Sequence, residues 1–288
     1  MRFCKFMLGA CLSFGLAIGE AAQAATIYAA GYGHPTNDTL YRIDTLAGTV
    51  TPVGAFGIDF TEGDLAFDLA SPPALYAAFS IPLRGLSVVD TGSGVASPIK
   101  SFNLGTTSDI SAMSFRPGDG RLFALDSGLN KLVTINTATG EGSLFGGTGD
   151  ISGLTDIAAV AGMAFDPINA DTLYMMTQYG STSLYKIQGF AGTPTATVVG
   201  DIGLSRVTGM TFALDGSQVK LFVINSDSTG SQLYSVDLNS LALTPVTVNN
   251  LPASIGGIAA PEPGALSLLV AGGAAVLLRR ARTAMKTR

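Results

Sequence analysis

Tryptophan is absent from this 288-residue sequence, and it contains one histidine and two cysteines. Both cysteines, Cys4 and Cys11, lie near the N-terminus. A chain that loses a short leader therefore has no thiol for a disulfide, a nucleophile or a cysteine-based metal site. Because His34 is the single histidine, a zinc site with two imidazole ligands is excluded. The lack of tryptophan argues against Trp-lined carbohydrate surfaces, although Tyr and Phe can also stack on sugars.

Charged residues make up only 13% of the chain, and they are unevenly distributed. Residues 25–261 hold nine Lys/Arg against nineteen Asp/Glu, a net charge of −10, whereas five basic residues lie in the last ten positions. An acidic body lacks the basic face that nucleic-acid phosphates require, so we expect no nucleic-acid partner. The 36 glycines, together with many Thr and Ser residues, favour short strands joined by tight turns.

Residues 1–24 have the three parts of a secretory signal. Arg2 and Lys5 form the positive start, residues 6–18 are apolar, and Ala22-Gln23-Ala24 offers the small residues that a signal peptidase accepts. This pattern predicts export of the chain with cleavage after Ala24.

The C-terminus also has three parts. Pro261-Glu262-Pro263 precedes a stretch without charge, residues 264–278, and a basic tail, residues 279–288. A helix usually needs about 20 apolar residues to cross a membrane, so this one would rely on bilayer thinning or on snorkelling arginines. The positive charge after the stretch predicts a cytoplasmic C-terminus and a body on the outside.

This C-terminal pattern, residues 261–288, resembles the PEP-CTERM sorting signal of Gram-negative bacteria. The resemblance implies recognition by an exosortase, a membrane cysteine transpeptidase that cuts near Pro261-Glu262-Pro263 and releases or re-attaches the body. It also implies a link to extracellular polysaccharide and biofilm matrix. The helix over 264–278 would then anchor the chain in the inner membrane only transiently.

Between the two ends, one pattern occurs five times, which indicates a repeat architecture. A strand rich in Leu, Tyr and Phe recurs at offsets of 48, 47, 51 and 48 residues, and a second strand and a turn, often Thr-x-x-Gly, follow each copy. The five copies of the first strand are residues 27–30, 75–78, 122–125, 173–176 and 221–224.

A further strand precedes four of these copies, at 64–67, 112–115, 162–165 and 209–212. The first copy lacks it, and the missing strand appears at the far end, at 256–260. This permutation predicts that the C-terminal strand completes the first sheet and closes a ring. We therefore predict an all-β fold, a five-bladed β-propeller over residues 25–260. An open β-rich array and a two-sheet sandwich are the alternatives. The pattern also resembles the repeats of secreted propeller-like families such as the DUF4394 type.

Acidic residues recur at one position after the second strand: Asp44, Asp90 and Asp237, with Asn136 and Gln188 in the other copies. Such a position indicates turn capping rather than a ring of metal ligands. Ligands of propellers bind at the loops of one face, and carboxylates dominate these loops here. The candidate binding rim consists of Asp59, Glu62, Asp109, Asp156 and Arg206 in the loops before the innermost strands, and of His34, Arg84, Asp126, Tyr179 and Asp227 in the other set.

No catalytic constellation is present, because there is no Gly-x-Ser-x-Gly motif, no phosphate-binding glycine loop and no second histidine. Asp59, Glu62 and Asp64 are close enough in sequence to share a Ca²⁺ ion, although they lack the spacing of an EF-hand. No cofactor is otherwise indicated, and solvated turn carboxylates are the alternative interpretation of this cluster.

We therefore expect an exported protein of the cell envelope or the extracellular space, processed by signal peptidase and an exosortase. Its propeller is expected to be a non-catalytic interaction module for a surface protein or a polysaccharide. Two alternatives stay open: a secreted propeller hydrolase or lyase acting on polysaccharide, since carboxylates are abundant, and a calcium-stabilised adhesive module.

Overall fold

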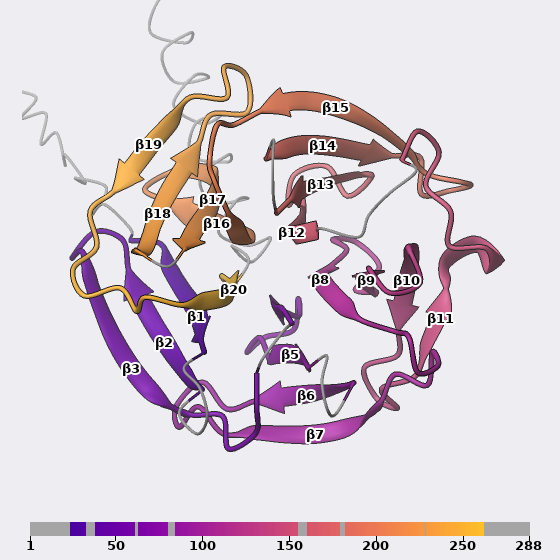
Figure 1. Ribbon diagram of the computed structural model, residues 1–288, viewed down its shortest axis with the longest axis horizontal. Helices are drawn as coiled ribbons and strands as arrows, with labels where there is room; N and C mark the ends of the chain where they lie inside the picture. Colours follow the sequence, from indigo (N-terminus) through magenta and orange to yellow (C-terminus); the bar gives the residue numbers. More distant parts are fainter. Residues whose placement is uncertain are drawn as a thin grey trace, which may run out of the picture.

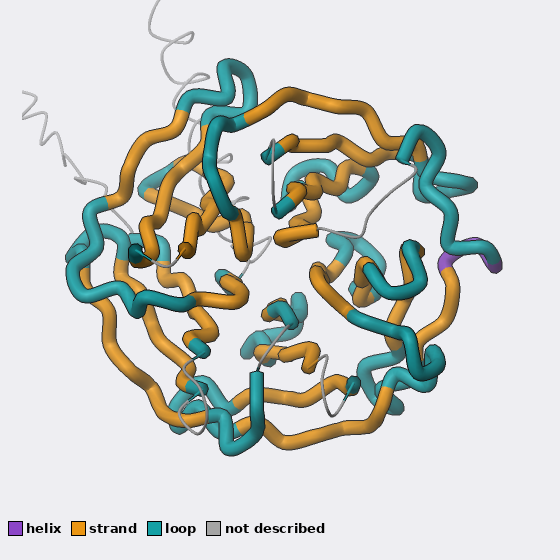
Figure 2. Tube along the Cα trace, viewed as in Figure 1, coloured by secondary structure: helices purple, strands orange, loops and turns teal. Residues whose placement is uncertain are grey.

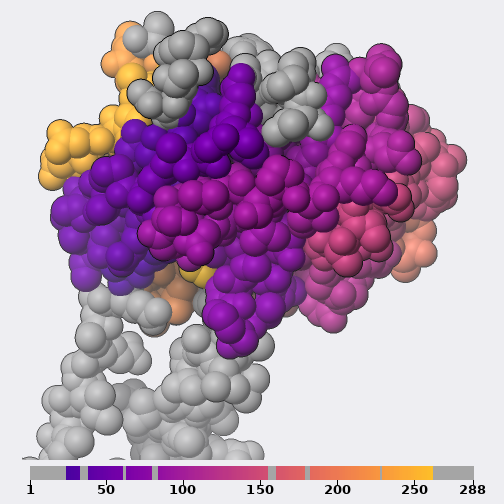
Figure 3. Space-filling model, turned by 90° about the horizontal axis from the view of Figure 1, so that it is seen from below, coloured from indigo at the N-terminus to yellow at the C-terminus, as the bar shows by residue number. Residues whose placement is uncertain are grey.

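The computed structural model describes residues 24–32, 38–60, 63–79, 84–154, 160–178, 182–227 and 229–261. These residues form twenty β-strands in five four-stranded antiparallel sheets, arranged as blades around a central axis (Figure 1). Seen edge-on, the ring is a thick disc (Figure 3). The prediction of an all-β five-bladed propeller is therefore confirmed. Several parts of the predicted sorting signals lie outside the described residues: residues 1–23 of the leader (1–24), Glu262 and Pro263 of the motif, the helix over 264–278 and the basic tail 279–288.

The strands follow one order in every blade, from the innermost to the outermost. Blade 1 contains β20 (Ile255–Ala259), β1 (Thr26–Gly31), β2 (Thr39–Asp44) and β3 (Thr49–Ala55). Blade 2 contains β4 (Leu65–Phe67), β5 (Leu75–Phe79), β6 (Gly85–Val89) and β7 (Ala96–Ser101). Blade 3 contains β8 (Ile110–Phe115), β9 (Leu122–Asp126), β10 (Lys131–Ile135) and β11 (Gly142–Leu144).

Blade 4 contains β12 (Val160–Phe165), β13 (Thr172–Thr177), β14 (Ser183–Gln188) and β15 (Thr195–Asp201). Blade 5 contains β16 (Val207–Asp215), β17 (Gln218–Asp227), β18 (Gly230–Val236) and β19 (Leu243–Val246). A short 3-10 turn, η1 (Phe145–Gly147), follows β11. Within the part of the chain that the structure describes, no helix is long and apolar enough to cross a membrane.

The ring closes where the sequence predicts. Strand β20 pairs antiparallel with β1, with Ala29 opposite Ile258, so blade 1 is built from both ends of the chain. A buried apolar cluster fills the joint between blades 5 and 1 and includes Ile27, Phe222 and Ile258. Similar clusters fill the other four joints. Because all five joints are packed, the open array and the two-sheet sandwich are excluded.

An aromatic pair recurs at the joints. The second strand of one blade supplies a Tyr or Phe ring that meets the last Phe of the innermost strand in the next blade. The centroid distances are 5.4 Å for Tyr28–Phe67, 5.4 Å for Tyr76–Phe115, 5.3 Å for Phe123–Phe165 and 5.8 Å for Tyr174–Phe212. At the joint between blades 5 and 1, Ala260 takes the place of the phenylalanine, and Phe222 packs in the same apolar cluster as Ala260. Aromatic pairs of this kind stabilise a fold by about 0.5–1.5 kcal/mol beyond their buried area.

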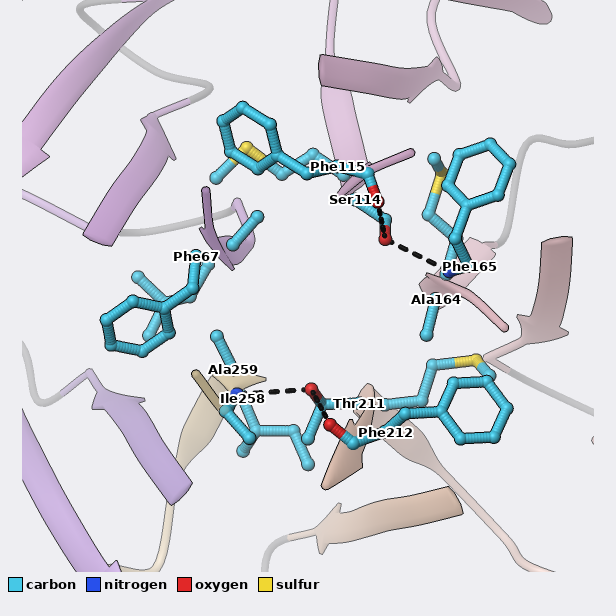
Figure 4. Close-up of a pocket in the computed structure, with 15 residues that line it drawn as sticks. Phe67, Ser114, Phe115, Ala164, Phe165, Thr211, Phe212, Ile258 and Ala259 are labelled. Carbon is cyan, nitrogen blue, oxygen red and sulfur yellow. Dashed lines mark hydrogen bonds between the residues drawn. The ribbon is translucent and has the colours of Figure 1, made fainter. Parts of the chain in front are cut away.

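The innermost strands surround a nearly closed axis. The rings of Phe67, Phe115, Phe165 and Phe212 point away from this axis, whereas the hydroxyls of Ser114 and Thr211 lie close to it (Figure 4). The Ser114 hydroxyl accepts the N–H of Phe165 at 3.0 Å, and the Thr211 hydroxyl accepts the N–H of Ala260 at 3.1 Å. The remaining cavity of about 20 Å³ has room for roughly one water molecule. The axis is therefore packed and is not a ligand channel.

Neighbouring innermost strands also approach each other closely at one position of the repeat. A Cβ atom on Gly162 would lie 2.8 Å from the N atom of Met210, and one on Gly209 would lie 2.8 Å from the N atom of Ile258. Blade 2 has Asp64 at this position. Its carboxylate accepts the N–H groups of Leu65 at 2.8 Å and Met113 at 2.9 Å, so it fills the space between blades 2 and 3.

The outermost strands form a belt around the perimeter (Figure 2). Backbone hydrogen bonds connect the end of one outer strand to the start of the next, such as Ala96 N–H to Phe56 O at 2.9 Å and Gly142 N–H to Phe102 O at 2.8 Å. The Thr-x-x-Gly turns lie at these connections, and Gly94 has a φ of 81°, which favours glycine. In blade 5 a leucine, Leu241, takes the left-handed conformation with a φ of 58°.

The recurring polar residues at the end of the third strand of the blades cap these turns, as the sequence predicts. Oδ1 of Asp44 accepts the N–H groups of Leu46 and Ala47, at 3.0 and 2.8 Å. Equivalent pairs of bonds are accepted by Asp90, Asn136 and Asp237. Blade 4 differs, because Gln188 donates to Thr172 there and Asp171 accepts the N–H groups of Gly189 and Phe190 instead.

Candidate functional site

The described residues of the predicted rim lie at one face of the disc, which we call the upper face. At this face the innermost strands begin, and the chain passes from the second to the third strand of each blade. The structure describes Asp59, Arg84, Asp109, Asp126, Arg206 and Asp227. The rim residues His34, Glu62, Asp156 and Tyr179 lie outside the described residues.

In blade 3 a buried carboxylate holds the two upper loops together. Asp126 is 0% exposed, and its Oδ1 accepts the N–H groups of Asp109 and Leu129, both at 2.9 Å. Its Oδ2 accepts the hydroxyl of Ser108, and the N–H of Ser127 donates to the carbonyl of Asp109 at 2.8 Å. Asp126 is thus a loop-fixing group beneath the face, not the exposed rim residue that the sequence suggested.

Blade 5 repeats this hydrogen-bonded arrangement of the two upper loops, which we call the frame, with another residue. Oδ1 of Asn225 accepts the N–H of Arg206 at 2.9 Å, and the N–H of Ser226 donates to the carbonyl of Arg206 at 3.0 Å. Asn225 is therefore the counterpart of Asp126, and Arg206 is the counterpart of Asp109. Sequence analysis missed Asn225, although its place at the end of the second strand is the available signal. One backbone frame thus presents a carboxylate in blade 3 and a guanidinium in blade 5.

Arg206 also connects the two blades that close the ring. Its Nη2 donates to the hydroxyl of Tyr32 at 3.4 Å, although 174 residues separate them in the chain. The Tyr32 ring lies against Gly256, where a Cβ atom would come within 3.1 Å of it. An aromatic ring and a guanidinium therefore lie side by side at the upper face, above the closing joint.

The other described rim residues have separate roles. Asp227 accepts the N–H and the hydroxyl of Thr229, and these bonds lower the pKa of its carboxyl, the Thr229 hydroxyl most strongly. Arg84 has a φ of 39°, and its carbonyl accepts the N–H of Phe102 at 3.0 Å. Asp59 is exposed. Asp227 ends β17 in blade 5, whereas Asp59 precedes β4 and Arg84 precedes β6 in blade 2, so the described rim residues are distributed around the face.

The calcium hypothesis rests on Asp59, Glu62 and Asp64. Asp64 is only 1% exposed, and both of its oxygens accept backbone N–H groups of the innermost strands. Burial raises the pKa of Asp64 well above its ordinary value, against the opposing effect of the hydrogen bonds from the N–H groups of Met113 and Leu65. Asp64 therefore belongs to the packing of the joint, whereas Asp59 is exposed at the surface. Within the described ranges, no three His, Cys, Asp or Glu side chains gather in a way that could hold a metal ion.

Buried polar atoms without a hydrogen-bond partner occur at the upper face of the described structure. They include Nη1 of Arg84, Oδ1 of Asp109 and Oγ1 of Thr208, the residue after Val207 at the start of β16. Such atoms are rare in native proteins, because each one loses its water without compensation. A guanidinium, a carboxylate and a hydroxyl beneath this face thus each have one buried polar atom that a bound water or an entering ligand group would satisfy.

The opposite, lower face holds both ends of the described propeller. The N–H of Thr45 donates to the carbonyl of Ala25 at 3.1 Å, at the end of blade 1 where β2 turns into β3. Ala259 pairs with Tyr28 near the same end, so Pro261 also leaves at the lower face. The chain ends and the rim are therefore on opposite sides of the disc.

These features define the class of the protein: a five-bladed β-propeller with distributed polar residues at one face. Residues 84–261, more than half of the chain, match the family described as a repeat of unknown function, DUF6923. The chain belongs to this family. No curated protein matches the chain.

Two solved structures are similar in fold. One is described as a nidogen/laminin complex, with a TM-score of 0.53 and 12% identity over 83% of this chain and 100% of that chain. The other is a structural genomics protein of unknown function from Bacteroides thetaiotaomicron VPI-5482. Its TM-score is 0.50, and the identity is 17% over 69% of this chain and 53% of that chain. At these identities the likeness concerns the fold alone.

Proposed function

We propose that the protein is an exported interaction module of the cell surface or the extracellular matrix, whose upper face binds a surface protein or a polysaccharide. Signal peptidase removes residues 1–24, and an exosortase processes the PEP-CTERM-like tail, residues 261–288. The propeller itself is non-catalytic in this proposal, and its relation to DUF4394-type repeats is one of likeness.

The observation that carries this proposal is that the two faces of the disc differ. The unpartnered polar atoms of Arg84, Asp109 and Thr208 are at the upper face, and the chain leaves at the lower face through Pro261. An anchor attached after Pro261 would leave the upper face directed away from the membrane. A binding face needs this orientation, because a tether on the same side would obstruct a partner.

Rigid packing of the five joints supports the same function. Loops on a rigid scaffold can vary in side chain without loss of the fold, and binding residues are often found there. The blade 3 and blade 5 frames illustrate this, since Asp109 and Arg206 occupy equivalent positions with opposite charges. The nidogen/laminin structure is a propeller-like protein in a complex with another protein, which makes a protein partner a natural candidate.

Intact-mass analysis of the protein from its native cells and medium tests the sorting part of the proposal. We expect a chain that begins near Ala25 and ends near Pro261-Glu262-Pro263. A chain that still carries Gly264 to Arg288 would mean that the tail is a plain membrane anchor. A chain that still begins at Met1 would contradict export.

A further inference from the structure

The outer rim departs from the repeat at blade 3. Strand β11 has only three residues, whereas β3 and β15 have seven, and the 3-10 turn η1 follows it. This turn appears as the purple segment at the edge of the ring (Figure 2). Together with the β14–β15 turn of blade 4, the segment lines an open groove with a volume of about 500 Å³. This groove between blades 3 and 4 is within the size range of small-ligand sites.

The floor of the groove is an aromatic surface. The half-buried Phe145 ring has centroid distances of 5.1 Å to Phe123 and 5.9 Å to Phe190, so neighbours hold it in place. The Arg121 guanidinium lies over the same surface, 5.4 Å from the Phe123 ring and 6.0 Å from the Phe145 ring. A flat apolar face with a planar cation beside it can stack on a ring of a ligand.

The walls carry hydrogen-bonding groups. The Thr134 hydroxyl lies 3.1 Å from the Ser143 hydroxyl, and Thr148, Thr193 and the carboxylate of Asp150 also line the groove. Two glycines widen it, because Cβ atoms on Gly146 and Gly192 would have nothing within 4 Å. A ligand in the groove would thus meet hydroxyls and a carboxylate around an aromatic floor.

The charges at the groove are already paired. Arg121 donates to Asp119 at 2.9 Å through Nε, and its Nη2 lies 2.8 Å from the same oxygen. Lys131 forms an ion pair with Asp150 through a single contact, from Nζ to Oδ1. An anionic ligand would therefore compete with Asp119 for Arg121, and a cationic ligand would compete with Lys131 for Asp150. This balance favours a neutral ligand rich in hydroxyls.

We propose that the groove between blades 3 and 4 binds one or two units of a neutral saccharide. The apolar face of a pyranose ring would lie on Phe145, and its hydroxyls would bond Thr134, Thr193 and Asp150. The site is at the side of the disc, away from the rim residues of the upper face. It therefore does not depend on the proposed function of that face.

A binding experiment with the full-length chain tests this. Cellobiose, maltose and N,N′-diacetylchitobiose serve as neutral probes, with digalacturonic acid as the acidic counterpart and a Phe-containing tripeptide as the peptide counterpart. Saturation-transfer NMR titrations give the affinities. We expect at least one neutral disaccharide to bind with a Kd of about 1 mM or tighter. No binding by any of the three neutral probes would overturn the proposal, as would binding of the acidic probe or the tripeptide alone.

Variants of the groove residues test whether the saccharide binds in this groove. Gly192→Leu puts a side chain into open space, so it should block the groove and weaken binding at least about tenfold without lowering the melting temperature. Gly192→Ala at the same position is the matched control and should bind like the natural chain. Thr134→Val removes one hydroxyl at constant volume and should weaken binding about threefold to tenfold. Unchanged affinity in both Gly192→Leu and Thr134→Val would contradict binding in this groove.

Discussion

The joints between the blades and the upper face use the five-fold repeat in opposite ways. At the joints one residue type returns in successive blades, as in the aromatic pairs Tyr28–Phe67 and Tyr76–Phe115. At the upper face the backbone frame returns while the side chain changes, as with Asp109 in blade 3 and Arg206 in blade 5. Repetition therefore marks the residues that hold the ring together, and variation on a fixed frame marks those that are free for binding.

Removal of a repeated aromatic ring should have the largest effect on stability. Phe165 is 1% exposed and lies 5.3 Å from Phe123 and 5.2 Å from Phe190, measured between ring centroids. We expect Phe165→Ala to lower the free energy of unfolding by about 3–5 kcal/mol, because it leaves a cavity in the joint between blades 3 and 4. Urea unfolding measures the change. Ile168→Ser, at a side chain that is 74% exposed, should change stability by less than about 0.5 kcal/mol. Equal effects of the two variants would refute the claim that the repeated aromatic residues hold the blades together.

A methyl group at a close approach of two innermost strands should have a somewhat smaller effect. Gly209→Ala would place its Cβ 2.8 Å from the backbone N atom of Ile258 and 3.1 Å from the Cα atom of Gly257, at the closing joint. The backbone must move, so we expect a loss of about 1–3 kcal/mol. Gly192→Ala, which meets nothing within 4 Å, is the matched control in the same urea series. If Gly209→Ala were as stable as this control, the tight closing joint would be disproved.

The one acidic residue at these approaches should make stability depend on pH. Burial raises the pKa of Asp64 in the folded protein, so the folded state retains a proton that the unfolded chain releases. The contribution of Asp64 is therefore fully present below its unfolded pKa of about 3.9. It is lost as the pH rises through the raised folded pKa, by at most about 1.4 kcal/mol per pH unit.

Asp64→Gly restores the residue that blades 4, 5 and 1 have at this position and removes the titrating group. We expect the natural chain to exceed this variant in stability most at low pH, with the difference shrinking as the pH rises. Urea unfolding at a series of pH values measures it. A difference that is constant with pH, or that grows with it, would show that Asp64 is not a desolvated carboxyl.

Changes at the upper face should have the smallest effect on stability and the clearest effect on binding. Arg206→Ser removes a guanidinium at the rim together with its hydrogen bond to Tyr32, and we expect it to lower the free energy of unfolding by about 1 kcal/mol. We also expect weaker retention of the protein on the matrix of the producing cells, measured by a sedimentation assay. The control is Arg42→Ser, an equal change of charge at an exposed site on β2, the third strand of blade 1. Equal retention of both variants would argue against binding of the matrix at the upper face.

Much of the fold follows from the sequence because the joints impose residue types. A Phe recurs at one position of four innermost strands, and Gly257 of the missing fifth strand lies 48 residues beyond Gly209, so closure of the ring is visible in the spacing. The turn caps Asp44, Asp90 and Asp237 were also predictable, because short acidic side chains bond the backbone of a following turn.

The candidate site was less predictable for physical reasons. The sequence does not show whether an aspartate is exposed or buried, so Asp126 was predicted to be a rim residue. Asn225 follows 221–224 as Asp126 follows 122–125, so the repeat aligns the two residues, but an uncharged amide does not stand out in a search for charged rim residues. The contact between Tyr32 and Arg206 joins residues 174 positions apart. The groove at Phe145 arises where the repeat is irregular, and an irregular segment carries no pattern.

The closed ring is the central claim, since the packed joints and the opposition of the two faces both depend on it. Hydrogen–deuterium exchange of the full-length chain tests it most directly, through the peptide that contains β20. We predict that the amides of β20 are as protected as those of β12 and β16, because β20 pairs with β1 and its Ile255 and Ile258 are buried. Exchange of β20 as rapid as that of the exposed β14–β15 turn, with β12 and β16 protected, would mean that the ring is open and would contradict the account.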